Sequence, residues 1–407
     1  MAAAAFAVLL LGAGTVHADP DMQSFSMIQR GKYLATLGDC VACHTAPGGK
    51  PFAGGLAVAT PFGTVVAANI TPDGETGIGA WTDAQFASVM HKGVARGGKL
   101  LYPAMPYNYY TKATAEDVLA IRAYLNTVEP VRNEVKSDQL PWPFSIRTSM
   151  LAWNELFLTA GQFKPTEGKP EEWNRGAYLV EGLGHCGACH TAKNFLGGDK
   201  ASQAYQGGAL QGWYAPNITG DKRTGLGGWS VEDIAVYLKT GHNRIAAASG
   251  PMAQVVSDST QWMTNADLTA VAVYLKDLPR QNQQATAISA QDRAVVAGQS
   301  IYVDNCSACH TAAGAGIPQL FPALANAPSI QSTDAASLIR VVLQGTQSVA
   351  TVDAPTAPAM PAFGWKLSDE EVASVVTYIR NSWGNAASSI SASDVQGARQ
   401  TLSEGGD

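Results

Sequence analysis

The sequence predicts an all-α protein built from three tandem domains. All six cysteines of the 407-residue chain fall in C-x-x-C-H motifs, which recur at domain-sized intervals. Each motif follows a short helical pattern and precedes an amphipathic helix with its own start signal. We place the three domains at residues 24–132, 172–280 and 291–387.

The three motifs predict covalent attachment of haem c. They read Cys40-Val-Ala-Cys43-His44, Cys186-Gly-Ala-Cys189-His190 and Cys306-Ser-Ala-Cys309-His310. This spacing lets two thiols reach the two vinyl groups of one porphyrin, and the next residue presents an imidazole to the iron. We therefore expect three haem c groups, held by the six cysteines, with the three motif histidines as axial ligands.

Three other uses of paired cysteines fit this pattern less well. A disulfide framework would not require a histidine after every pair. A zinc site needs four ligands, from a second pair or from two spaced histidines. A thioredoxin-like pair would occur once, within a βαβ pattern. Three complete motifs that use every cysteine favour haem over all three.

The helices that flank each motif define the repeat. Arg30-Gly31-Lys-Tyr33 precedes the first motif and Arg175-Gly176-Ala-Tyr178 the second, and a weaker Gly298…Tyr302 precedes the third. Glycine allows close helix packing, and tyrosine is the expected large apolar partner. The last helices start at capping patterns, which are Thr114…Asp117, Thr264…Asp267 and Ser368…Glu371. First and last helices that cross beside a haem are the cytochrome c arrangement.

The first two domains also share an Asn-Ile-Thr element, at residues 69–71 and 217–219. Such a sequence can be a glycosylation acceptor. Because it recurs at the same place in a domain repeat, we expect a structural turn instead.

A methionine precedes each final helix and supplies a candidate sixth iron ligand. These residues are Met105, Met252 and Met360. A thioether opposite histidine raises the reduction potential of a haem. Met90 aligns with Leu238 in the repeat and is therefore expected in the core. His91, His185 and His242 recur at no equivalent position, so we expect none to be a ligand, and we expect His185 at the surface.

The segments outside the repeat predict export and packing. Residues 1–18 read as an apolar signal peptide cleaved after Ala18, although no basic residue precedes the apolar run; about ten apolar residues are too few for an anchor. Residues 133–171 form an apolar linker, expected to pack across domains one and two or to contact a dehydrogenase or membrane. Residues 281–290 are a polar linker, and residues 388–407 a polar tail.

The motifs together resemble a known family. "RGKYLATLGDCVACHTAPGGKPFAGG", "NITPDGETGIGAW", "LYPAMPY", "GPMAQVV" and "MPAFGWKLSDEEV" are similar to segments of the three-haem cytochrome c subunits of bacterial periplasmic dehydrogenases. The resemblance covers roughly residues 24–387 and implies the same twelve haem residues. It also implies electron transfer from a dehydrogenase catalytic subunit to ubiquinone, at the periplasmic face of the cytoplasmic membrane. Relatives often end in an apolar anchor or amphipathic tail, whereas residues 384–407 here are polar, so a partner could provide attachment.

These observations predict an electron-transfer subunit with no substrate chemistry of its own. The net charge of −6 and the absence of a long basic run argue against nucleic-acid binding. Two alternatives stay open: a free-standing carrier that feeds a terminal oxidase, and a multihaem peroxidase. A peroxidase needs an iron with an open distal position, which the three methionines disfavour.

Overall fold

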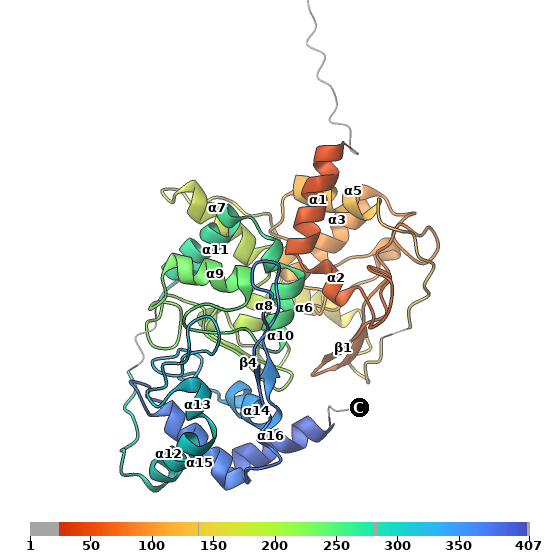
Figure 1. The fold of residues 1–407 in the computed structure, drawn as a ribbon. Helices are drawn as coiled ribbons and strands as arrows, with labels where there is room; N and C mark the ends of the chain where they lie inside the picture. The colour runs from red at the N-terminus through yellow and green to blue at the C-terminus, as the bar shows by residue number, and fades with distance from the viewer. Residues whose placement is uncertain (1–23, 137, 281–283, 405–407) are drawn as a thin grey trace, which may run out of the picture.

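Three pairs of crossing helices form the framework of the protein (Figure 1). The computed structural model describes residues 24–136, 138–280 and 284–404; the expected signal peptide lies outside them. We call residues 24–132, 172–280 and 291–404 the first, second and third units. The pairs are α1 (Phe25–Leu37) with α5 (Ala115–Leu125), α7 (Glu171–Glu181) with α11 (Asn265–Asp277), and α12 (Arg293–Asn305) with α15 (Asp369–Arg380).

A glycine at each crossing lets the two backbones touch. A β-carbon on Gly31 would lie 1.8 Å from the carbonyl oxygen of Ala120. The corresponding distances are 2.0 Å from Gly176 to the Ala270 oxygen and 2.1 Å from Gly298 to the Ser374 oxygen. No side chain fits in these spaces, so the close helix packing predicted at these glycines is confirmed.

The second helix of each crossing pair begins at the predicted cap. The side chains of Thr114, Thr264 and Ser368 accept hydrogen bonds from the backbone N–H three residues later, at 3.2, 3.2 and 3.3 Å. These bonds satisfy one of the free N–H groups at each helix start. Only in the third unit does the acidic side chain, Glu371, return the bond to the cap backbone.

The remaining elements are short and surround these pairs. The first unit adds α2 (Cys40–Cys43), β1 (Ala57–Thr60), β2 (Gly63–Val66), α3 (Asp83–Lys92), η1 (Arg96–Gly98) and α4 (Tyr107–Tyr110). The second adds α8 (Gly187–His190), η2 (Ala201–Gln203), β3 (Gly208–Leu210), β4 (Trp213–Ala215), α9 (Val231–Thr240), α10 (Pro251–Asp258) and η3 (Thr260–Trp262). The third adds α13 (Ser307–His310), α14 (Ala336–Gln344), β5 (Thr346–Gln347), β6 (Ala359–Met360) and α16 (Ala392–Glu404). The described strands form antiparallel two-stranded hairpins, β1–β2, β3–β4 and β5–β6.

The Asn-Ile-Thr elements are buried turns, as predicted. Asn69 is 3% exposed, and its side-chain oxygen accepts the N–H of Thr71 at 2.9 Å. Asn217 does the same for Thr219 at 2.8 Å. Because both amide nitrogens donate hydrogen bonds inside the protein, these side chains organise the local backbone.

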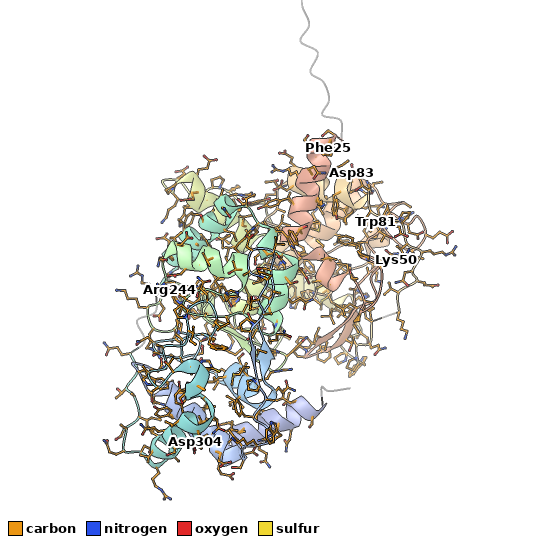
Figure 2. All side chains as sticks on the ribbon, viewed as in Figure 1. Phe25, Lys50, Trp81, Asp83, Arg244 and Asp304 are labelled. Carbon is orange, nitrogen blue, oxygen red and sulfur yellow. The ribbon has the colours of Figure 1, made fainter. Side chains whose placement is uncertain are left out.

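The first two units share one continuous apolar core, whereas the third has its own. Figure 1 shows the first and second units side by side and the third below them. Figure 2 accordingly places Phe25, at the start of α1, and Asp304, near the end of α12, at opposite ends of the molecule. Met90 is 4% exposed in the shared core, which confirms its predicted position.

The apolar linker packs across the first two units and also leaves apolar side chains exposed. In α6 (Ser149–Phe157), Trp153 is buried against Tyr107, and its indole N–H donates to the carbonyl of Leu196 at 3.1 Å. Tyr107 in turn donates to the side chain of Asn154 at 2.7 Å. We define the exposed apolar residues around α6 as the linker patch: Trp142, Phe144, Ile146, Leu151, Leu156, Phe195 and Leu196.

The residues expected to be only a polar tail include a helix that completes the third unit. Val395, on α16, is fully buried, and Arg399 donates hydrogen bonds to Asp369 at 2.6 Å and to the carbonyl of Leu367 at 2.7 Å. The packed unit therefore continues past residue 387. Within residues 24–136, 138–280 and 284–404, no helix has the length and apolar character needed to cross a bilayer.

Candidate haem-binding sites

Each C-x-x-C-H motif forms a single helical turn after the first helix of its unit. These turns are α2, α8 and α13. In all three, the backbone N–H of the histidine donates to the carbonyl of the first cysteine, at 3.0 Å. The turn brings the two thiols and the imidazole of one motif close together, as attachment of one porphyrin requires.

The three motif histidines are held in the same orientation by a backbone carbonyl. The Nδ1 atoms of His44 and His190 lie 2.7 Å from the carbonyl oxygens of Ala68 and Pro216. Nδ1 of His310 lies 3.0 Å from the carbonyl of Pro322. When Nδ1–H donates to this carbonyl, Nε2 carries the lone pair that can bind iron.

Burial also favours the neutral imidazole that a metal ligand must be. It lowers the pKa of His44, His190 and His310 below the ordinary value, against the opposing effect of the hydrogen-bonded carbonyls. The tautomer and the neutral charge state of these three imidazoles thus fit axial ligation of a haem iron.

The cysteines do not fit the alternative uses. All six are unpaired. Burial raises the pKa of Cys40 and of Cys186 to about 12 and that of Cys306 to about 11, whereas a redox-active pair has a lowered thiol pKa. In the described part of the chain, no group of three or more His, Cys, Asp and Glu side chains could hold a metal ion.

The candidate methionines precede α5, α11 and α15: Met105 lies in a loop, Met252 in α10 and Met360 on β6. Met105 packs on the same apolar core as Cys40, and Met360, on β6, packs on the same core as Cys306. Met252 differs, because it packs with Val256 and with Val349 of the third unit. The wall around Met252 is thus completed by another unit.

The other histidines have different surroundings. His91 Nε2 lies 3.0 Å from the carbonyl of Ala113. His185 was expected at the surface, but its ring packs edge-on against Tyr110, with centroids 5.6 Å apart. The contact forms because the second unit packs against the first here. His242 is 7% exposed, and neither ring nitrogen has a protein partner.

The first and second units contact each other near both attachment turns, which the sequence did not predict. Tyr109, in α4 just after Met105, donates to Asp199 beside the second motif at 2.5 Å. Its hydroxyl would lie 2.9 Å from a β-carbon on Gly187, inside that motif. Conversely, Ser259, after α10, donates to the carbonyl of Leu37 at 2.8 Å. The tyrosines that follow Met105 in the sequence indicate a packing surface, but the sequence does not show that Tyr109 contacts Asp199, which lies far along the chain.

Comparisons with known proteins identify relatives of this chain. The cytochrome c family model matches residues 295–383. The cytochrome c subunit of gluconate 2-dehydrogenase from Pantoea cypripedii is 42% identical, covering 93% of this chain and 91% of that protein. The cytochrome c subunit of a quinone alcohol dehydrogenase from Gluconobacter oxydans strain 621H is 40% identical, over 98% and 87%. The fructose dehydrogenase cytochrome subunit from Gluconobacter japonicus is 35% identical, over 98% and 89%.

Proposed function

Because this chain belongs to the family of cytochrome c subunits of quinone-dependent gluconate, alcohol and fructose dehydrogenases, we propose that it carries electrons away from a dehydrogenase catalytic subunit through three haem c groups. It is an electron-transfer subunit and not a catalytic enzyme on its own. The observation that carries the proposal is that Nδ1 of the histidine lies within hydrogen-bond distance of a backbone carbonyl at all three motifs.

The residues of the chain have distinct roles in this proposal. Haem supplies one-electron redox chemistry, and the protein supplies ligation, burial and spacing. The cysteine pairs would anchor each porphyrin, and the histidines would bind iron through Nε2. Met105, Met252 and Met360 would supply the sixth ligands. Pro106 directly follows Met105, and Pro251 is the first residue of α10, and both prolines restrict the local backbone.

We expect three covalently bound haems in each mature chain. Each of the three turns presents two thiols and one oriented imidazole, and no cysteine is left over. Mass spectrometry of the mature protein measures the number of haems directly. A count other than three, or haem that acidic solvent extracts, would contradict the proposal.

The linker patch is proposed to bind the dehydrogenase catalytic subunit. Trp142 is 80% exposed, Leu156 65% and Phe195 86%. The carbonyl of Leu196, next to Phe195, accepts the indole N–H of Trp153 on α6 at 3.1 Å, which brings the segment of Phe195 to the linker. Large exposed apolar patches mark interaction sites. The relatives are named as subunits of dehydrogenases, so the partner of this chemistry is the catalytic subunit.

Replacing Trp142, Leu156 and Phe195 together with serine is expected to weaken binding of the catalytic subunit at least tenfold, since a few large apolar residues carry most interface energy. Affinity of the purified cytochrome for that subunit measures this. Trp365→Ser is the matched control, because Trp365 is 82% exposed in the third unit. Unchanged affinity of the triple variant for the catalytic subunit would contradict this assignment. If the complex stayed intact but was released from membranes, the patch would be a membrane contact instead.

We further propose that the chain works in the periplasm, at the face of the cytoplasmic membrane, and that ubiquinone accepts its electrons. The apolar N-terminal segment and the family's association with quinone-dependent enzymes support this proposal. The test compares how fast the purified complex reduces quinone with how fast it reduces a terminal oxidase. Quinone reduction supports this proposal, whereas reduction of the oxidase alone would support the free-standing carrier. Three methionine ligands would leave no iron open for peroxidase chemistry.

A further inference from the structure

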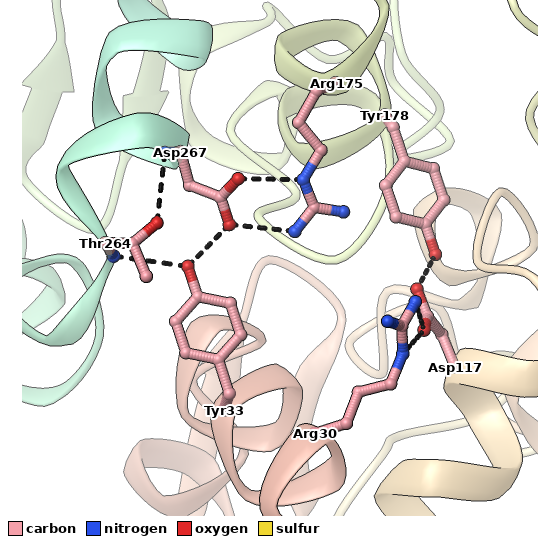
Figure 3. Close-up of polar contacts among 7 residues, drawn as sticks. All are labelled: Arg30, Tyr33, Asp117, Arg175, Tyr178, Thr264 and Asp267. Carbon is pink, nitrogen blue, oxygen red and sulfur yellow. Dashed lines mark hydrogen bonds and ion pairs between the residues drawn. The ribbon is translucent and has the colours of Figure 1, made fainter. Parts of the chain in front are cut away.

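Two tyrosines, one from each of the first two units, form hydrogen bonds across the interface between these units (Figure 3). We call this pair of hydrogen bonds the exchange. Tyr33 of the first unit donates to Asp267 of the second at 2.6 Å. Tyr178 of the second donates to Asp117 of the first at 2.5 Å. The two bonds are reciprocal, because each tyrosine follows the glycine of one helix crossing and reaches the final helix of the other unit.

Each phenol binds the start of the helix that it reaches. The hydroxyl of Tyr178 accepts the N–H of Thr114 at 3.2 Å, and the hydroxyl of Tyr33 accepts that of Thr264 at 3.3 Å. Every tyrosine thus uses its donor and its acceptor at once. Burial raises the pKa of both phenols to about 12, so both remain donors at physiological pH.

An arginine of the same unit orients each carboxylate toward the tyrosine. Arg30 donates to Asp117 at 2.6 Å. Arg175 donates to both oxygens of Asp267 at 2.8 Å. Asp117 is 1% exposed and Asp267 8%, and a buried carboxylate is costly unless it is paired and hydrogen-bonded. Each carboxylate therefore needs both its arginine and the tyrosine of the other unit as hydrogen-bond partners.

The third unit lacks all three parts of this arrangement. Ala297 stands where the arginine precedes the glycine, and Ser300 stands where the tyrosine follows it. Glu371 replaces the aspartate and caps its own helix. The buried Tyr302 donates to the carbonyl of Thr311 within its own unit, at 2.6 Å. The exchange is thus specific to the first two units.

The same interface brings two haem-attachment turns together. The hydroxyl of Tyr110 donates to the carbonyl of Gly38, two residues before Cys40, at 3.1 Å. The ring of Tyr110 packs edge-on against His185, which directly precedes Cys186, with centroids 5.6 Å apart. Tyr110 therefore contacts the chain just before both attachment turns.

We propose that the Tyr33–Asp267 and Tyr178–Asp117 exchange locks the first two units into one two-haem body. The four side chains are positioning residues that hold the two porphyrins in a fixed relation. This inference rests on the proposed function, in which both motifs carry haem.

Circular dichroism of the holoprotein in the haem Soret band tests the pair, because coupling between neighbouring chromophores depends on their distance and orientation. Wild type is expected to show a two-signed signal. The Tyr33→Phe/Tyr178→Phe variant loses two hydrogen bonds to charged groups. Each bond is worth about a tenfold change in the equilibrium between the locked and the unlocked arrangement of the two units. The variant should therefore lose at least half of the signal amplitude.

Tyr302→Phe is the matched control, since it removes a buried phenol that bonds only within the third unit. It should keep the full signal. If the double variant does not fold, Tyr33→Phe and Tyr178→Phe are measured singly, and each should reduce the amplitude. A wild-type signal of one sign, or variants that keep the wild-type amplitude, would overturn the pair. A mass that lacks the first or second haem would instead overturn the proposed function.

Discussion

Met105→Leu is expected to lower the reduction potential of one haem by on the order of 0.1 V or more, within the roughly 0.8 V that axial ligands span. Leucine nearly conserves the volume of methionine, so the packing of the Met105 loop on the first core should persist. The variant removes only the thioether, which leaves the distal face of that iron open to water or to an added ligand. Redox titration and the spin state of the iron measure the change.

The control for this experiment is Met90→Leu. Met90 is buried in the same apolar core but is not proposed as a ligand. Its replacement should cost less than about 1.5 kcal/mol of stability and leave all three potentials in place. Equal potentials in the Met105 variant and wild type, with every iron still low-spin, would exclude Met105 as a ligand. Met252→Leu and Met360→Leu extend the test to the other two units.

Gly31→Ala is expected to destabilise the protein by about 3 kcal/mol or more, the upper range for overpacking. The added β-carbon would meet the Ala120 carbonyl at 1.8 Å and the side chain of Tyr124 at 3.0 Å. The neighbour is backbone, so it cannot move aside without separating α1 from α5. Denaturant unfolding of the holoprotein measures the free energy.

Gly397→Ala is the matched control, because Gly397 lies within α16 and a β-carbon there meets nothing within 4 Å. Alanine should stabilise that helix by up to about 1 kcal/mol. If the two alanine variants had equal stability, the backbone contact at the first helix crossing would not limit the fold.

The sequence by itself determined the local features of this protein. The one-turn attachment motifs, the capped helix starts and the Asn-Ile-Thr turns each depend on residues a few positions apart. Their geometry follows from hydrogen bonds that form within a single turn. The crossing at Gly31 was also predictable, because the same glycine pattern recurs before all three motifs.

Only the tertiary structure decided which units meet. Tyr33 was expected as a large apolar packing partner, but its hydroxyl donates to Asp267, which lies far along the chain. The polar composition of residues 388–407 also concealed α16, whose few apolar residues gather on one side against the third core. Periodicity reports which face of an element is apolar; the partner of that face depends on how distant segments share one core, and no local pattern carries that information.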